Sequence, residues 1–193
     1  MAAHSIDSLC NAALYYLAQT PDRYDPLMTN HFNHVIYLIN VIYYIQTGQS
    51  LLNQRELDTF VETDYGPASY VINAITFNYE DIISIYRTQQ HAFDINREFN
   101  QQERNFIKKY STKLYNTNSL DLIDAFTNMP GFNKSNYHDT WNFNQSIKYF
   151  KKRSDLLWLI LKSDLTTKTW SLHQSVPSIF VAKTSKNSDT VSN

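Results

Sequence analysis

The stretch 35–45, with the sequence VIYLINVIYYI, constrains the fold more than any other part of the chain. Its apolar residues point in nearly every direction around a helix instead of forming one stripe. The β-branched residues would also suit a strand, but the length of the segment from about Asn30 to Gln46 and the closing Gly48 favour a helix. A helix that is apolar all round is normally buried. We therefore predict a helix at the centre of a helical bundle.

Further helices are predicted around this central one. Apolar residues recur at steps of three and four along several other segments. Ser5 is a suitable N-cap for the first, and Asn100 forms a capping-box-like pair with Glu103 at the start of another. A Pro-Gly turn follows the third. The predicted helices cover 6–17, 100–114, 119–126 and 145–162.

A Tyr-Gly-Pro sequence at 65–67 predicts a sharp corner. The chain has only three glycines in 193 residues, and Gly66 can adopt a positive φ or permit close backbone approach. Pro67 suits the first turn of a helix. The preceding segment 57–65 is short and rich in β-branched and aromatic residues, which suits an extended piece. We predict an extended segment that turns directly into a helix, whose apolar stripe is Tyr70, Val71, Ala74 and Ile75.

Together these elements predict an α+β, mainly α fold: a compact helical domain with a small antiparallel strand element and a C-terminal extension. One or two short strands are possible in 78–96, where the periodicity is mixed. The domain is predicted to cover 1–144 and the extension 145–183. The apolar run 156–161 in that extension must be sandwiched or covered, and burial within the domain is favoured. The small, polar residues 184–193 predict a disordered tail.

Residues that could carry chemistry are few. His31 and His34 have a spacing that can bind metal, but no third ligand is apparent, and we expect a surface pair near a helix start. Nucleotide-binding glycine motifs and G-x-S-x-G are absent from the sequence. Asp121 and Asp124, and the pair at 80–81, are explained as solvated carboxylates. The predictions are therefore no catalysis, no metal and no cofactor.

Charge gives little reason to expect nucleic acid as a partner. The formal net charge is −1, with 17 basic and 18 acidic residues. The main basic cluster, at 148–153, could meet phosphates, but a solvated helix face explains it better. Its combination of cations with nearby aromatic residues suits a protein interface. The candidate partner contacts are Lys151, Lys152, Arg153, Trp158 and Trp170.

The lone cysteine and the first residues bear on localisation. Cys10 cannot form an intramolecular disulfide, and its apolar neighbours predict a buried, inert thiol. The first ten residues lack the basic and apolar regions of a secretory signal. The run 156–161 is far shorter than the ~20 residues that a membrane-spanning helix needs. We expect a cytoplasmic protein with no membrane association; no oligomeric state is predicted.

Several short motifs follow one another in order: NAALYYLA at 11–18, FNHVIYL at 32–38, Gly48 before a Leu-Leu pair, the corner at 65–67, and SLDLIDAFTNMPGF at 119–132. In this order they resemble the Panacea antitoxin domain, also described as SocA-like or phage-associated, over roughly 6–141. The residues that carry the resemblance, called the signature residues below, are Phe32, Tyr37, Gly48, Tyr65, Gly66, Pro67, Thr127 and Pro130. The chain departs from the family pattern at His34, where Lys is usual, at Asn128, where His is usual, and at Gly131-Phe132, where Trp is usual.

The resemblance implies a protein-binding antitoxin and not an enzyme. Such domains neutralise diverse toxins by direct contact, and some act as adaptors that deliver a toxin to a protease. The cognate toxin is then the expected partner, with the region from Gln145 contributing to partner choice. The alternatives are a phage or mobile-element protein that inhibits another host factor, a nucleic-acid-binding regulator that uses the basic cluster and, last, an enzyme of unknown type.

Overall fold

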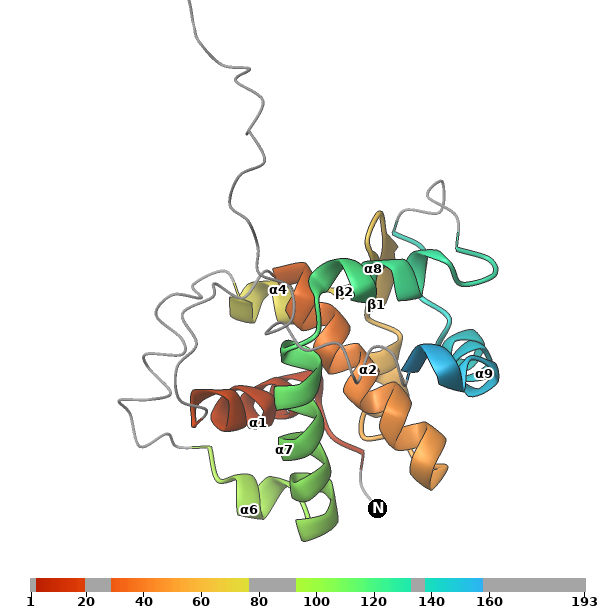
Figure 1. The fold of residues 1–193 in the computed structure, drawn as a ribbon. Helices are drawn as coiled ribbons and strands as arrows, with labels where there is room; N and C mark the ends of the chain where they lie inside the picture. Colours follow the sequence, from red (N-terminus) through yellow and green to blue (C-terminus); the bar gives the residue numbers. More distant parts are fainter. Residues whose placement is uncertain (1–2, 20–28, 77–92, 133–137, 158–193) are drawn as a thin grey trace, which may run out of the picture.

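The computed structural model describes residues 3–19, 29–76, 93–132 and 138–157 (Figure 1). The fold is α+β and mainly helical, with a small antiparallel pair of strands, as the sequence predicts. The described helices are α1 (Ile6–Ala18), α2 (Thr29–Thr47), α3 (Gln54–Leu57), α4 (Tyr70–Thr76), α6 (Ile95–Glu98), α7 (Gln101–Tyr115), α8 (Ser119–Thr127) and α9 (Phe143–Lys152). The strands are β1 (Phe60–Thr63) and β2 (Gly66–Ser69). No helix in these ranges is long and apolar enough to cross a membrane.

Helix α2 forms the centre of the molecule, as its all-round apolar sequence predicts. Every residue from 31 to 43 is buried. The helix contacts α1, α4, α7, α8, α9 and β2. In Figure 1 it runs diagonally through the middle, with α1 and α7 on one side and α9 on the other. It ends at Gly48, whose N–H donates to the carbonyl of Tyr44 (2.8 Å) and whose φ of +71° suits a glycine that closes a helix.

The outer helices begin where their polar caps predict. The Ser5 side chain accepts from the N–H of Ser8 at the start of α1. Asn100 and Glu103 form a true capping box at the start of α7: the Glu103 N–H donates to Asn100 Oδ1 (3.0 Å), and the Asn100 N–H donates to Glu103 Oε2 (2.9 Å). Cys10 is fully buried, and burial raises the pKa of its thiol. This agrees with the predicted inert cysteine.

The corner at 65–67 differs from its prediction. Gly66 to Ser69 do not enter a helix but form β2, which pairs with β1 in the register Phe60↔Ser69 and Thr63↔Gly66. Helix α4 starts only at Tyr70. Pro67 fits this position because β2 lies at an edge of the described sheet, while the other side of β1 bonds to 138–141.

The stripe predicted for α4 is only partly confirmed: Val71 and Ile75 are partly buried and pack against the core, but Tyr70 and Ala74 are exposed. Ile72 and Thr76 face the interior, whereas Tyr70 is 70% exposed. The start of the helix explains the difference, because the Ser69 N–H is bound by the buried Asn33 Oδ1 of α2 (2.7 Å). That bond fixes which face of the following turn meets α1 and α2, and both helices contact α4.

The last described segment packs into the same core as the rest. Ile147, Phe150 and Leu157 are buried core residues. The prediction of one helix from 145 to 162 is wrong at Arg153, where the backbone (φ −110°, ψ 52°) interrupts the helix. Residues 154–157 are helical again. Most of the apolar run 156–161, the tail and most of the possible strand region 78–96 lie outside the described residues; the described end of that region holds α6.

Candidate functional site

The signature residue Tyr37 lies at the centre of an aromatic junction. Its ring makes edge-on contacts with Phe60 of β1 (4.9 Å between centroids), Phe126 of α8 (5.7 Å) and Trp141 (6.3 Å). Its hydroxyl donates to Ser146 Oγ of α9 (2.8 Å), which also accepts from Trp141 Nε1 (2.9 Å). Burial raises the pKa of Tyr37, and the bond to Ser146 opposes that shift. The junction ties α2 to β1, α8 and α9, which is a structural role.

The two histidines of α2 are buried, so the predicted surface pair is wrong. His31 is 6% and His34 is 2% exposed. The two ring nitrogens of His31 lie 3.1 Å from the Tyr115 carbonyl and 3.0 Å from Ser119 Oγ. The chain after α7 and the tip of the hairpin cover this part of α2, which local sequence does not reveal. Within the described ranges no three His, Cys, Asp or Glu side chains gather closely enough to hold a metal ion.

His34 supports the turn between the strands. Its ring packs on Phe126 (4.9 Å between centroids) and is hydrogen-bonded to the backbone of Tyr65. Its Nδ1 has no hydrogen-bond partner among the described residues. Burial is the main cause that lowers the pKa of His34 to about 3, and the nearby His31 adds to the effect. The imidazole is therefore neutral at physiological pH.

Gly66 lets the hairpin approach this histidine. Its φ is +118°, and a Cβ there would lie 2.8 Å from Phe126 Cβ and 3.1 Å from His34 Nε2. Only glycine fits both the backbone angle and the space. The signature glycine of the corner thus brings the strand turn directly onto α2 and α8.

Three large apolar side chains are exposed on the elements around the hairpin: Tyr65 at its turn, Tyr70 just beyond the opposite end of β2, and Leu120 near the start of α8. Tyr65 is 50%, Tyr70 is 70% and Leu120 is 58% exposed; they are the large hydrophobic residues that the described surface exposes most, and we call them the hairpin surface. They belong to the β1–β2 turn, the start of α4 and the start of α8. These elements lie together at the upper end of the molecule in Figure 1, and β2 contacts both helices.

The remaining signature residues occupy varied positions. Phe32 and Pro67 are buried, Thr127 is half-buried and Pro130 is exposed. The N–H of Phe132 donates to the carbonyl of Met129 (3.1 Å), which forms the predicted Pro-Gly turn. Asn128 donates to the Asp124 carbonyl (2.8 Å) and so closes α8.

The predicted partner contacts are only partly described. Lys151, Lys152 and Arg153 are exposed at the end of α9. Arg153 pairs with Asp155 (3.1 Å), and the Nζ of Lys151 lies 5.9 Å from the centroid of the Tyr44 ring. Trp158 and Trp170 lie outside the described residues, as does the carboxylate pair at 80–81.

A cavity of about 580 Å³ lies beside α9, and we call it the α2–α9 cavity. Its lining comes from the end of α2, the loop that follows it, α7 and the start of α9. The lining includes Tyr43, Tyr44, Asn53, Glu103, Phe143 and Asn144. The loop is held in place by Asn40, whose fully buried Oδ1 accepts from the N–H groups of Leu51 (2.8 Å) and Leu52 (3.0 Å).

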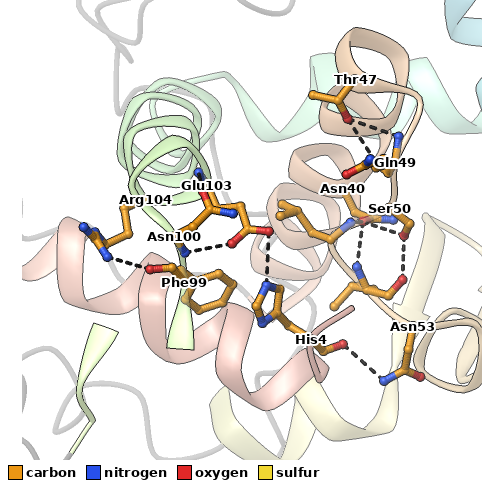
Figure 2. Close-up of polar contacts among 12 residues, drawn as sticks. His4, Asn40, Thr47, Gln49, Ser50, Asn53, Phe99, Asn100, Glu103 and Arg104 are labelled. Atoms are coloured by element: carbon orange, nitrogen blue, oxygen red, sulfur yellow. Dashed lines mark hydrogen bonds and ion pairs between the residues drawn. The ribbon is translucent and has the colours of Figure 1, made fainter. Parts of the chain in front are cut away.

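Figure 2 shows Glu103 between the N-terminus of α7 and His4. Besides accepting from Asn100, the carboxylate has its Oε1 3.4 Å from His4 Nε2, a distance of ionic contact without hydrogen-bond alignment. The His4 ring packs on Phe99 (4.1 Å between centroids). Sequence reasoning identified Glu103 only as a cap. The cavity was missed because its other walls come from distant parts of the chain.

Comparison of the chain with models of protein families, with curated proteins and with solved structures finds no match. The resemblance to the Panacea domain therefore stays a prediction that rests on the order of the motifs.

Proposed function

We propose that the protein is a cytoplasmic antitoxin that neutralises a toxin by direct contact, and that the hairpin surface is part of the contact. Tyr65 is the observation that carries the proposal. A large aromatic signature residue needed only for packing would be buried, as Tyr37 is, but Tyr65 is half-exposed. Tyrosine is among the residues that most often dominate the binding energy of protein interfaces.

The turn that presents Tyr65 is held on both sides. The Thr63 hydroxyl donates to the Gly66 carbonyl (2.8 Å), and His34 is hydrogen-bonded to the Tyr65 backbone. A side chain on a turn fixed in this way loses little conformational entropy when a partner binds, which favours affinity.

The proposal is tested by co-expression with the neighbouring gene. We expect the neighbour alone to stop growth, the pair to restore growth, and the two proteins to purify together. Tyr65→Ala should weaken the complex at least about tenfold, the size of effect typical of a buried interface tyrosine. Lys108→Ala is the control, because Lys108 is exposed on α7, away from the hairpin.

Two results would count against the proposal in different ways. A neighbour that is neither toxic nor bound removes the antitoxin function and leaves the inhibitor of another host factor as the best account. A stable complex that Tyr65→Ala and Lys108→Ala leave equally strong would move the contact away from the hairpin surface. Thermal melts of both variants establish that each one is folded.

A further inference from the structure

We propose that the α2–α9 cavity binds the guanidinium group of an arginine side chain presented by a peptide. The inference goes beyond the proposed antitoxin function and does not need it, since the cavity lies beside α9 and its ligand is defined by its own chemistry. Three features carry it: one buried carboxylate, its remaining acceptor sites and the aromatic walls.

The charged group that lines the cavity is a carboxylate, and two basic side chains outside the lining contact its walls: His4 Nε2 lies 3.4 Å from Glu103 Oε1, and Lys151 Nζ lies 5.9 Å from the centroid of the Tyr44 ring. Of the described lining residues, Glu103 alone carries a full charge, and it is 4% exposed. Water screens a charge in such a place much less than at the surface, so an incoming cation gains more from it. The other polar groups of the described lining are neutral amides and hydroxyls, including those of Asn53 and Asn144.

The acceptor sites of Glu103 favour a guanidinium over an ammonium. An ionised carboxylate offers about four acceptor sites, two on each oxygen. Oε2 uses one for the N–H of Asn100 (2.9 Å), while Oε1 has only the unaligned contact with His4 at 3.4 Å. Acceptor capacity therefore remains on both oxygens. A guanidinium has parallel N–H groups that can bind two oxygens at once, which an ammonium cannot match in geometry.

The walls suit a flat cation. Tyr43, Tyr44 and Phe143 line the cavity, and the rings of Tyr44 and Phe143 meet edge-on (5.7 Å, 85°). Guanidinium groups stack on aromatic faces and are more weakly hydrated than ammonium groups, so they lose less on entering such a site. The volume lies within the range of roughly 300–1,000 Å³ that is usual for ligand sites and leaves room for flanking peptide.

The test uses two blocked tripeptides, acetyl-Gly-Arg-Gly-amide and its citrulline counterpart, titrated into the full chain by calorimetry or NMR. Citrulline keeps the shape of arginine but is neutral. We expect the arginine peptide to bind with a Kd on the order of 1 mM, and the citrulline peptide at least about tenfold more weakly. The lysine peptide should also bind more weakly. Equal binding of all three, or no binding of the arginine peptide up to about 10 mM, would overturn the proposal.

Glu103→Gln is the decisive variant, because glutamine can still complete the capping box while the charge is lost. It should weaken arginine-peptide binding at least about tenfold. Glu98→Gln is the matched control: it removes an exposed carboxylate on nearby α6 and should leave binding unchanged. Undiminished binding by Glu103→Gln would refute the assignment. If that variant does not fold, Tyr44→Leu takes its place, and unchanged binding there refutes the stacking and with it the site.

Discussion

His34→Gln should remove a large part of the acid sensitivity of the fold. The native state holds His34 neutral, because burial lowers its pKa from 6.5 to about 3. Once unfolded, the side chain regains its ordinary pKa. Below pH 6.5 His34 therefore binds a proton in the unfolded state but stays unprotonated in the native state, so acid stabilises the unfolded chain. The contribution of His34 is fully present above its unfolded pKa and is lost progressively as the pH falls toward the folded value.

The size of the effect follows from the two pKa values. At about pH 5 the unfolded histidine is largely protonated and the native one is not. At about 1.4 kcal/mol per pH unit, this one group makes the protein about 2 kcal/mol less stable than at pH 8. This loss of stability hardly depends on the pKa of His34 in the folded state, because any folded pKa well below 5 gives nearly the same loss.

The assay is urea unfolding of the parent and of His34→Gln, followed by circular dichroism at about pH 8 and pH 5. Glutamine keeps a donor for the Tyr65 backbone but does not titrate in this range. We expect the parent to lose about 2 kcal/mol more than the variant between the two pH values. If both proteins lose the same amount, then His34 is not held neutral and its buried position in the native state is refuted.

Three further predictions follow from the packing. Gly66→Ala should lower the free energy of unfolding by about 2–4 kcal/mol, from backbone strain and the clash with Phe126. Gly48 also has a positive φ but open space around it, so Gly48→Ala should lower it by only about 1 kcal/mol. Equal shifts of the melting temperature would contradict the close approach of Gly66 to Phe126. Ser146→Ala should cost about 1–3 kcal/mol because it leaves two buried donors unpaired, and a denaturant midpoint like the parent's would show that they find other partners. Reversing the charges at 151–153 should cost about 1–2 kcal/mol, because it breaks the exposed Arg153–Asp155 pair and places anions at the C-terminal end of α9. The fold should survive this loss, but the toxin complex should weaken; a pull-down with unchanged yield would remove these residues from the interface.

Local signals predicted the helices well. The all-round apolar 35–45 identified the central helix, since few other structures can bury it. Ser5 and Asn100 marked helix starts because an N-cap acts over only three residues. The closing Gly48 marked a helix end for the same reason. These features depend on neighbours in sequence, so they can be read from the sequence alone.

Features that depend on distant partners were missed. Pro67 suits both a helix start and an edge strand, and pairing with β1 together with the Asn33 bond to Ser69 selects the strand. The burial of His31 and His34 depends on segments 30 or more residues away along the chain. The α2–α9 cavity needs at least three separate elements in place. None of these outcomes is encoded in a local period or cap.

The central position of α2 also affects how the protein is made. The ribosome completes this helix at residue 47, but α7, α8 and α9, which cover much of it, end only at residue 152. Translation proceeds at about 5–20 residues per second, so on the order of ten seconds pass between the synthesis of α2 and the completion of α7, α8 and α9. During that interval a nascent chain exposes the stretch that is most buried in the finished fold. Synthesis of this protein should therefore depend on chaperones that bind the nascent chain. The yield of folded protein should rise when the rate of translation does not exceed the supply of these chaperones.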